Sequence, residues 1–387
     1  MPRQGSPGPA RPGRSRGRQA GPIRCGGVRE LDAAGIHDPG LRASYARARA
    51  LHAAHGRTYY LATLLLPAWK RPYVHALYGF ARHADNIVDD VDSSLTGAER
   101  ADLLSAWGTR FLAALRDGAR AETVDAGLAT AAGATPTNAT LARDTVARDT
   151  VATAPAEAMG TGGIGADGGG VSVLPATVDT IRRFSLDPAH FGAFLDSMAM
   201  DLTVDGYATW DDLFVYMHGS AAVIGLQMVP VLEPVDDSAL PYARDLGIAF
   251  QLANFIRDVG EDLRRGRVYL PGTSMDLFGV TREHLAAGVV DGPVRRLLAF
   301  EISRARELFR AAEPGIRLLH PTSRDCMRTA FVLYRAILDE VERADYRVLE
   351  RRVSVSVGRR LAVAGPALVR ATRSHRRHRQ DQPGPPR

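Results

Sequence analysis

Two segments of this sequence place acidic side chains one helical turn apart inside otherwise apolar runs. In the first, YGFARHADNIVDD at residues 78–90, four polar side chains share one face of a helix: Tyr78, Arg82, Asp85 and Asp89. Aspartates at this spacing repel one another by roughly 0.2–0.5 kcal/mol on an exposed helix, and by more when partly buried. Since aspartate is also a poor helix former, the pair needs a partner that compensates for its charge.

The second segment, QLANFIRDVGEDLRRGRVYLP at residues 251–271, repeats the pattern with Gln251, Asn254, Asp258 and Asp262. Carboxylate oxygens are the ligands that hard divalent cations prefer. One such pair of acids is most often a solvated face. Two pairs within apolar helices that also carry Arg, Asn, Gln and Tyr indicate a metal site instead. Facing one another across a cavity, the two helices would hold several Mg²⁺ ions.

Arginines flank both segments and indicate an anionic substrate. Arg264, Arg265 and Arg267 follow the second segment, and Arg57 and Arg82 flank the first. Mg²⁺ takes one or two carboxylates and completes its shell with phosphate and water, and guanidinium groups suit diphosphate oxygens. Loss of a diphosphate would create a carbocation, which needs an apolar, aromatic-lined pocket that excludes water. The candidate aromatic side chains are Tyr59, Tyr78, Tyr216, Tyr269 and Tyr334.

Helical periodicity dominates on both sides of an Ala-, Thr- and Gly-rich stretch at residues 118–176, whereas strand alternation is weak throughout. We therefore predict one all-α domain over residues 40–355, with 118–176 as a flexible insertion. TGAE at residues 96–99 resembles a helix capping box. Residues 1–39 are predicted to be a disordered basic tail, and residues 356–387 a basic helix end followed by a disordered tail.

Composition excludes several other classes of protein. The formal net charge is +6, but much of the excess lies in two tails without interleaved aromatic residues, so no nucleic-acid partner is expected. Cys25 and Cys326 give neither a disulfide framework nor a metal-binding spacing, which favours a reduced, cytosolic setting. The sequence shows no signal peptide, and no run approaches the ~18 apolar residues of a spanning helix. Lysine is nearly missing, and no Gly-Lys-Ser/Thr motif indicates a phosphate-binding loop.

The two acidic segments, in this order and context, resemble those of the squalene/phytoene synthase family. The matching pieces are DNIVD and NFIRDVGED, with LDSMAMDL and RTAFVLYRAILDEVERADYRVLERR around them, over residues 40–355 apart from the insertion. The phrase RDVGEDLRRGRVYLP looks most like that of bacterial phytoene synthases. The resemblance implies a single-domain, all-α isoprenoid-synthase fold with helices around a central cavity.

The resemblance also implies a reaction of carotenoid biosynthesis, the head-to-head condensation of two geranylgeranyl diphosphates to phytoene. The first half-reaction ionises one diphosphate and forms a cyclopropyl intermediate, prephytoene diphosphate. The second ionises that intermediate, rearranges it and removes a proton. The implied cofactor is Mg²⁺ or Mn²⁺, and no NADPH is expected. The alternative within the family is a squalene- or dehydrosqualene-type synthase that uses farnesyl diphosphate.

Residue by residue, the resemblance assigns three sets of roles, in which the side chains hold metal, bind diphosphate or lie near the reacting carbons. The implied metal ligands are Asp85, Asp89, Asn254, Asp258 and Asp262. The implied catalytic residues are Tyr78, Arg82, Tyr216, Tyr269 and Tyr334. The implied substrate-binding residues are His55, Arg57, Thr58, Arg82, Gln251, Asn254, Arg257 and Arg351.

Some features depart from the family's pattern. Ala222 stands where a glycine is usual, and Gly206 stands where an arginine commonly precedes the tyrosine at position 207. Neither these nor the insertion touches the acidic segments, but they leave the chain-length preference open. Two other classes remain as alternatives: a terpene cyclase, which would use one substrate per turnover, and a non-catalytic assembly subunit. The first predicts a differently spelled second motif, and the second predicts damaged motifs.

The expected partners follow from the implied reaction. Prenyl diphosphates are the substrates, and the product is too apolar to leave easily into water. We therefore expect a cytoplasmic protein with peripheral contact at the inner face of the membrane. The protein is expected to be a monomer or a weak dimer.

Overall fold

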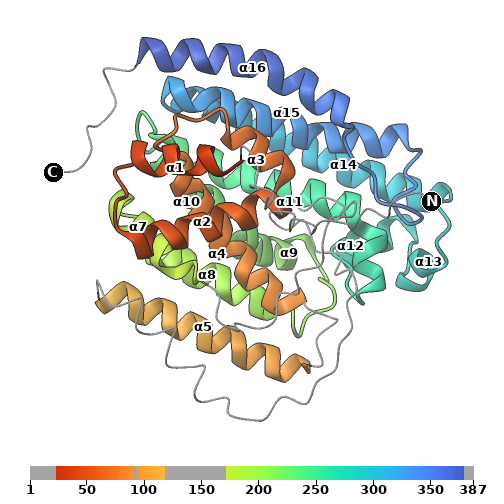
Figure 1. The fold of residues 1–387 in the computed structure, drawn as a ribbon. Helices are drawn as coiled ribbons and strands as arrows, with labels where there is room; N and C mark the ends of the chain where they lie inside the picture. Colours follow the sequence, from red (N-terminus) through yellow and green to blue (C-terminus); the bar gives the residue numbers. More distant parts are fainter. Residues whose placement is uncertain (1–22, 90–94, 118–170, 379–387) are drawn as a thin grey trace, which may run out of the picture.

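The computed structural model describes residues 23–89, 95–117 and 171–378, which fold into a bundle of helices (Figure 1). The helices before residue 118 are α1 (Ile23–Ala33), α2 (Pro39–His55), α3 (Arg57–Thr63), α4 (Arg71–Asp89) and α5 (Gly97–Asp117). Those that follow are α7 (Leu174–Phe184), α8 (Pro188–Met200), α9 (Trp210–Met217), α10 (Val223–Leu232), α11 (Ala239–Arg264), α12 (Gly272–Phe278), α13 (Arg282–Ala286), α14 (Gly292–Ala312), α15 (Pro321–Arg343) and α16 (Val357–Arg377). A π-helical turn, His218–Ala222, joins α9 to α10, and a 3₁₀ turn, Glu313–Leu318, follows α14.

The predicted all-α class is confirmed. Within the described ranges no strand forms, and β-type pairing is limited to two isolated bridges, Gly206 with Val268 and Pro234 with Leu319. The bridge at Gly206 lies between the segment after α8 and the segment after α11, so it holds two loops of the candidate site together.

Local sequence signals set several helix ends. Ahead of α5, Thr96 Oγ1 accepts a hydrogen bond from the Glu99 backbone N–H at 3.2 Å. The Glu99 carboxylate accepts one from the Thr96 N–H at 2.7 Å, which confirms the predicted capping box. Helix α2 begins with Pro39, directly after the N-cap residue Asp38, and ends at His55, just before Gly56.

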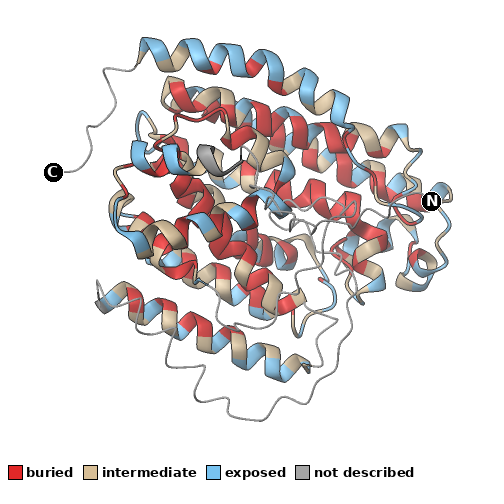
Figure 2. Ribbon diagram, viewed as in Figure 1, coloured by how far each residue is buried: buried red, intermediate tan, exposed pale blue. Residues whose placement is uncertain are grey.

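Helix α11 lies in the middle of the bundle and packs against α10, α14 and α15 (Figure 1). Helices α2, α4 and α7 form a second group, and α4 contacts α8 and α10. In Figure 1, α5 runs along the lower edge and α16 along the upper edge. Figure 2 shows that most of α11 is buried, whereas α5 and α16 each expose one face. The two helices that carry the acidic segments, α4 and α11, are therefore inner helices.

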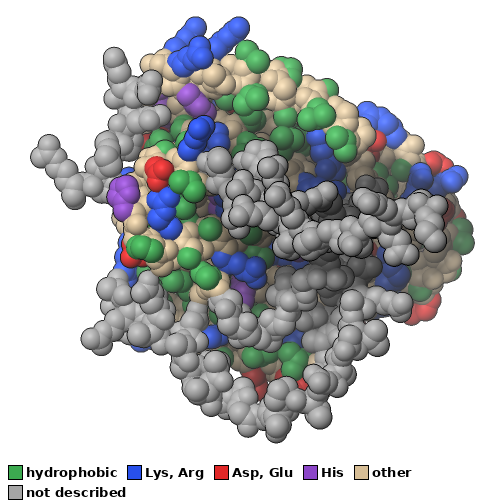
Figure 3. Space-filling view, viewed as in Figure 1, with side chains coloured by type: hydrophobic (Ala, Val, Ile, Leu, Met, Phe, Trp, Pro, Cys, Tyr) green, Lys and Arg blue, Asp and Glu red, His purple; other side chains and the backbone are tan. Residues whose placement is uncertain are grey.

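Helix α16 packs on α15 through small residues and exposes a face with large apolar side chains. Ala364, Ala367 and Ala371 are buried. On the exposed side are Val357, Leu361, Leu368 and Val369. Figure 3 shows hydrophobic and basic side chains together along this helix at the upper edge of the molecule.

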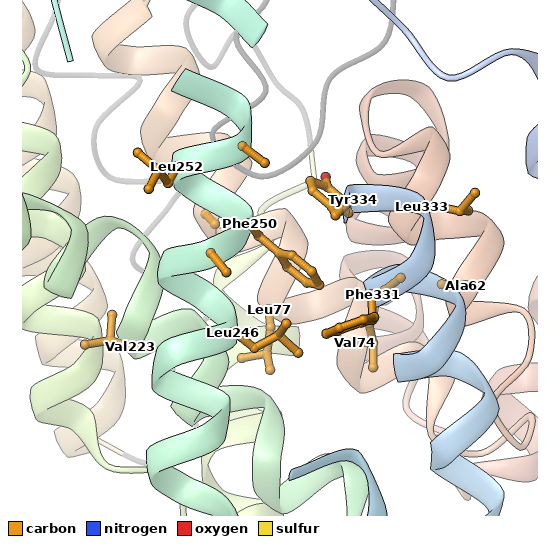
Figure 4. Packing of buried hydrophobic residues seen from close by; sticks show 14 of the residues in the cluster. Ala62, Val74, Leu77, Val223, Leu246, Phe250, Leu252, Phe331, Leu333 and Tyr334 are labelled. Atoms are coloured by element: carbon orange, nitrogen blue, oxygen red, sulfur yellow. The ribbon is translucent and has the colours of Figure 1, made fainter. Parts of the chain in front are cut away.

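Figure 4 shows the apolar packing where α4, α11 and α15 meet. Leu246 and Phe250 of α11 gather there with Leu77 of α4 and Phe331 of α15. The rings of Phe250 and Tyr334 are 4.4 Å apart between centroids. Aromatic pairs at this distance add about 0.5–1.5 kcal/mol beyond the burial of their area.

Two glycines let the backbone of α11 approach its neighbours closely. A Cβ at Gly247 would lie 2.4 Å from the carbonyl oxygen of Ala221 in the π-helical turn. A Cβ at Gly260 would lie 2.6 Å from the carbonyl oxygen of Val348, in the segment that follows α15. This close contact holds the segment after α15 against α11, and from there Arg352 reaches Asp258.

The predicted boundaries of the domain need three corrections. The N-terminal tail is shorter than 39 residues, because α1 forms within it and buries Leu31. The insertion ends before residue 176, because Val173 and Leu174 are buried at the start of α7. Helix α16 continues to Arg377 on the surface of α15, so the C-terminal end is a full helix. The rest of the predicted disorder, in residues 1–22, 118–170 and 379–387, lies outside the described residues.

The first of these errors has a tertiary cause. Helix α1 is held by charged partners on other helices, since Glu30 pairs with Arg49 of α2 and Arg71 of α4. A reading of local hydrophobic periodicity cannot include such partners. Helix α12 has only seven residues, too few to show a helical period in the sequence.

Among the described helices, the continuous stretch Trp210–Leu232 is long and apolar enough to cross a membrane by length and composition. It comprises α9, the π-helical turn and α10. Within its apolar window 61% is buried inside the fold. A core helix of a globular protein meets the same criterion, and packing against α8 and α11 accounts for this one.

Candidate active site

The acidic face of α4 is buried and paired with arginines. Asp85 accepts a hydrogen bond of 2.8 Å from Nη1 of Arg82, one turn earlier on the same helix. Asp89, at the end of α4, accepts hydrogen bonds from Arg265 Nη1 at 3.3 Å and from Arg267 Nη1 at 3.1 Å. Because both arginines follow α11, these contacts join the end of one acidic segment to the end of the other.

The acidic face of α11 is buried as well. Asp258 accepts hydrogen bonds from Arg257 Nε at 2.8 Å and from Arg352 Nε at 3.0 Å. Burial alone would raise the pKa of Asp258, but the guanidinium groups of Arg257 and Arg352 lower it below its usual value. This carboxyl group is therefore ionised at neutral pH. Glu261 lies 3.1 Å from Arg265 and 3.8 Å from Arg352, so the arginines link neighbouring acids.

The oxygen atoms on these two faces suit Mg²⁺. Within the described residues, no three Asp, Glu, His or Cys side chains cluster closely enough to hold a metal ion by themselves. Mg²⁺ does not require such a cluster, because it takes one or two carboxylates and fills its octahedron with phosphate and water. Asn254 Oδ1 is buried, and it has no hydrogen-bond partner in the described part of the chain. A metal ligand looks unpaired when only hydrogen bonds within the protein are considered, because its partner is the metal ion. The position of Asn254 beside Asp258 and Asp262 fits this explanation.

A further carboxylate, Asp201, organises two of the predicted tyrosines. Tyr216 Oη donates to Asp201 Oδ2 at 2.8 Å, and Tyr269 Oη donates to Asp201 Oδ1 at 2.6 Å. Arg267 Nη1 lies 3.9 Å from Asp201, so one arginine lies near both Asp201 and Asp89. Asp201 belongs to the LDSMAMDL segment, whose sequence alone did not indicate this role. Its only local signal is an acid directly after the apolar helix α8.

Beside the two acidic faces lies an apolar cavity bounded by α3, α4, α10, α11 and α15. Tyr78 of α4 and Gln251 of α11 line it, together with Tyr59 and Phe250. About 140 Å³ of this cavity is open to the centre of a water molecule, roughly ten times the 10–15 Å³ that a single water needs. Because Tyr78 and Gln251 lie on the same helix faces as the acids, the cavity continues from the charged region into the core.

Several predicted residues are not part of the cavity lining. Tyr334 is not part of the cavity lining; it lies behind it, stacked on Tyr59 with ring centroids 4.7 Å apart. His55 is half-buried, and burial, with help from Arg82 and Arg47, lowers its pKa to about 4. At the start of α3, Arg57 is exposed and Thr58 half-buried.

The arginine after α15 that reaches the site differs from the prediction. Arg351 is exposed, whereas its neighbour Arg352 hydrogen-bonds Asp258. The segment after α15 is not helical at this point, so sequence alone did not indicate which of two adjacent arginines turns inward. Arg352 is therefore the arginine of this pair that contacts the acidic face of α11.

Comparison with known proteins agrees with this geometry. A sequence model of the family described as "Squalene/phytoene synthase" matches residues 52–359, which is most of the chain. A phytoene synthase of Arthrospira platensis is 33% identical over 341 residues, covering 85% of this chain and 93% of that protein. A 15-cis-phytoene synthase of Synechococcus elongatus is 31% identical over 344 residues, covering 86% and 94%.

Solved structures show the same fold. A dehydrosqualene synthase in complex with a ligand superposes with a TM-score of 0.64 at 21% identity, covering 86% of this chain and 98% of that one. A squalene synthase from Alicyclobacillus acidocaldarius gives 0.60 at 23% identity, covering 81% and 98%. At these identities the likeness concerns the fold, which confirms the predicted isoprenoid-synthase architecture. With the family match and the phytoene synthase relatives, it shows that the chain belongs to the squalene/phytoene synthase family.

Proposed function

We propose that this chain is a metal-dependent phytoene synthase that joins two geranylgeranyl diphosphates head to head through prephytoene diphosphate. The observation that carries the proposal is the continuity of each acidic helix face with the apolar cavity. On α4, Tyr78 lines the cavity seven residues before Asp85, and on α11, Gln251 lines it three residues before Asn254. A prenyl diphosphate has the same two parts, an anionic head and a long apolar chain. The relatives named phytoene synthase support this choice of substrate.

The acidic faces would hold the metal. Asp85 and Asp89 on α4, and Asn254, Asp258 and Asp262 on α11, present the oxygen atoms. Mg²⁺, when bound, supplies positive charge that stabilises a departing diphosphate.

The arginines of the site bind and orient the anionic head. Arg82, Arg265, Arg267 and Arg352 each hydrogen-bond an acid of the two faces. A guanidinium carries five N–H donors, so a group that holds a carboxylate through one or two of them keeps others for phosphate oxygens. These side chains would place the carbon that leaves diphosphate at the mouth of the cavity, beside Tyr78.

The cavity wall protects the cation. Its lining is mainly aliphatic and aromatic, which excludes water from the reacting carbons. The Tyr207, Tyr216, Tyr269 and Phe255 rings form a second aromatic cluster, with Phe255 and Tyr269 stacked at 4.1 Å. Asp201 holds the two phenol groups of Tyr216 and Tyr269, so these rings have one fixed orientation.

The chain length of the substrate distinguishes the main proposal from its alternative. The curated relatives are named phytoene synthases, whereas the solved structures include dehydrosqualene and squalene synthases. A product assay separates them: purified protein with Mg²⁺ is offered geranylgeranyl or farnesyl diphosphate, with and without NADPH. Phytoene from the first substrate without NADPH supports the proposal. A hydrocarbon from farnesyl diphosphate alone would move the chain to the squalene-type branch.

We also propose that this cytoplasmic enzyme contacts an anionic membrane surface through α16. The exposed face of α16 carries Leu361 and Leu368, which are 60% and 52% exposed. Toward its C-terminal end the helix carries Arg370, Arg373, Arg376 and Arg377. An apolar stripe next to arginines is the pattern of a helix that lies in the membrane interface. Such contact would let an apolar product pass from the enzyme directly into the membrane.

A further inference from the structure

A pair of buried histidines lies at the wall of the cavity, on α2 and α4. His52 and His75 are each 1% exposed, and their Nδ1 atoms are 2.9 Å apart, a hydrogen-bond distance. His75 Nε2 lies 3.8 Å from Oε2 of Glu30 on α1. Glu30 accepts hydrogen bonds from Arg49 Nε and Arg71 Nη1, each at 3.1 Å. A carboxylate and two imidazoles thus form a row that leads from α1 to the cavity.

The neighbours of each ring decide which nitrogen carries its proton. The Glu30 carboxylate can only accept, so it favours the form of His75 with hydrogen on Nε2, which leaves His75 Nδ1 as an acceptor. His52 Nδ1 must then be the donor of the 2.9 Å hydrogen bond, and His52 Nε2 keeps its lone pair. Burial lowers the pKa of both histidines, although Glu30 opposes this for His75. Both rings are therefore neutral at pH 7.

His52 borders the cavity, and its lone-pair nitrogen is buried. His52 lines the cavity, and its Nε2 has no hydrogen-bond partner in the described part of the chain. The imidazole stacks on Tyr78 with centroids 4.1 Å apart and planes 7° apart. A Cβ at Gly56 would lie 2.6 Å from His52 Cδ2 and 2.8 Å from Tyr78 Cε2, so this glycine leaves room for the stacked rings.

The position of the His52 ring suits a proton transfer near the reacting carbons. Tyr78 lies one turn before Arg82 on α4, which is about 6 Å along the helix axis. The His52 ring is therefore close to the head end of the cavity, where the diphosphate is proposed to bind. The other candidates for a base are engaged: Asp85, Asp89 and Asp258 accept from arginines, and the phenols of Tyr216 and Tyr269 donate to Asp201.

We propose that His52 Nε2 accepts the proton whose removal completes the reaction, an assignment that rests on the proposed function. After the second diphosphate leaves, a C–H bond next to the cationic carbon breaks and its electron pair forms the central double bond. The proton is transferred to His52 Nε2, giving an imidazolium. Its Nδ1–H donates to His75, and the Glu30 carboxylate beyond His75 stabilises the positive charge. His75 and Glu30 are positioning residues, because they fix the tautomer of His52 without touching the substrate.

The test follows the two half-reactions separately in wild type and His52→Phe, using geranylgeranyl diphosphate and Mg²⁺ in single turnovers. Phenylalanine keeps an aromatic ring against Tyr78 and removes the base. We expect release of the first diphosphate at close to the wild-type rate. Phytoene formation falls by about 10²-fold or more, the usual contribution of a general base. Prephytoene diphosphate or water-trapped alcohols take its place.

A second variant tests the roles of Glu30 and His75 while keeping the base, His52. Glu30→Gln keeps His52 but no longer selects its tautomer, so proton loss slows and becomes partly rate-limiting. Substrate deuterated at C1, the carbon that forms the central double bond, then shows a primary isotope effect on phytoene formation that exceeds the wild-type effect. A purely structural role for Glu30 would not change this isotope effect. His37→Phe, at an exposed histidine before α2, is the matched control and should behave as wild type.

Three results would overturn the assignment. Phytoene formation by folded His52→Phe at the wild-type rate would show that another group, such as the released diphosphate, takes the proton. An equal loss of both half-reactions would show that His52 is structural. If His52→Phe does not fold, an unchanged isotope effect in Glu30→Gln overturns the proposal. If wild type uses only farnesyl diphosphate, the same comparison is made with that substrate; if wild type forms no hydrocarbon at all, the proposed function fails first.

Discussion

Arg267 donates a hydrogen bond of 3.1 Å to Asp89, 178 residues earlier in the chain. This contact joins the end of α4 to the segment after α11, and Arg265 makes a parallel contact with the same carboxylate. The acids that the sequence left without a compensating charge therefore have arginine partners in the fold. Since the same arginines are able to bind phosphate, the acidic faces and the anion-binding groups form one site.

Replacing single acids of the two faces should remove activity without unfolding the protein. Asp89→Asn and Asp258→Asn each remove one negative charge from a face proposed to hold Mg²⁺. We expect turnover to fall at least ~100-fold, with helix content unchanged by circular dichroism. Asp102→Asn, at an exposed aspartate of α5, is the control. Near-normal turnover in either site variant would remove the assignment of that residue as a metal ligand.

Asp201 should stabilise the aromatic cluster through its two tyrosines. Asp201→Ala removes the acceptor of two buried hydroxyl groups, so we expect the free energy of unfolding to fall by about 2–4 kcal/mol. In a Tyr216→Phe, Tyr269→Phe background the same substitution should cost much less, because those hydroxyls are absent. Asp205→Ala, at an exposed site four residues later, should change stability by less than about 0.5 kcal/mol. Equal costs of Asp201→Ala in both backgrounds would show that the hydroxyl contacts contribute little.

Glu30 should make stability depend on acid pH. Burial alone would raise its pKa, but contacts with His75, Arg71 and Arg49 outweigh burial and lower the pKa to about 2. Because the folded pKa is below the unfolded value of ~4.3, the stabilisation is present above that value and is lost as pH falls toward 2. The size is below the ~3 kcal/mol of the full shift, because part of that shift comes from His75, which is neutral at pH 7. In urea titrations, the difference between wild type and Glu30→Gln should shrink between pH 6 and pH 3; a constant difference would contradict the shift.

The only lysine of the sequence, Lys70, is fully buried just before α4. Lys70 Nζ lies 2.5 Å from Glu233 Oε2 and donates to Ser323 Oγ at 2.8 Å, which ties α10 and α15 to the start of α4. Burial lowers the pKa of Lys70, and the Glu233 carboxylate opposes this shift. Glu233→Gln leaves a buried ammonium without its counter-charge. We expect a loss of about 2–3 kcal/mol, below the value for a fully buried pair, because the carboxylate is 33% exposed.

The matched double variant separates charge from packing at this position. Lys70→Met combined with Glu233→Gln should cost less than the sum of the two single changes, because no unpaired charge remains. Urea denaturation of the four proteins measures the coupling. Additive losses would show that the ion pair makes no net contribution.

Contact with a membrane should depend on the exposed face of α16. We expect Leu361→Ser with Leu368→Ser to weaken binding to phosphatidylglycerol-containing vesicles by at least ~10-fold, since each leucine contributes apolar area. Sedimentation with vesicles measures this. Leu277→Ser, at an exposed leucine of α12, is the control and should bind as wild type. Equal binding of all three proteins, or binding that does not require anionic lipid, would contradict the proposed surface.

The sequence predicts features that depend on neighbouring residues, and it does not predict contacts between residues far apart in the chain. The faces that carry Asp85 and Asp258 depend on helical period alone, and both helices form where that period indicated. The capping box of Thr96 and Glu99 is equally local. The contacts of Asp201 with Tyr216 and Tyr269 join segments that are 15 and 68 residues apart, and no local pattern marks them.

The choice of Arg352 over Arg351 and the row formed by Glu30, His75 and His52 depend on tertiary packing in the same way. Arg352 reaches Asp258 across 94 positions of sequence, in a segment brought close by the glycine at position 260. His52 and His75 are on two helices that pack against each other, and each looks like an ordinary residue of an amphipathic helix. Such residues are found only when the helices are placed in space.

The central claim is that one site ionises two prenyl diphosphates for each hydrocarbon formed. The most direct measurement is the number of diphosphates released per molecule of product, in one reaction with geranylgeranyl diphosphate and Mg²⁺ and in a parallel reaction with EDTA. We predict two diphosphates for each phytoene, and neither product when EDTA is present. One diphosphate for each hydrocarbon, with a cyclic product of a single prenyl chain, would contradict the account and identify a terpene cyclase instead.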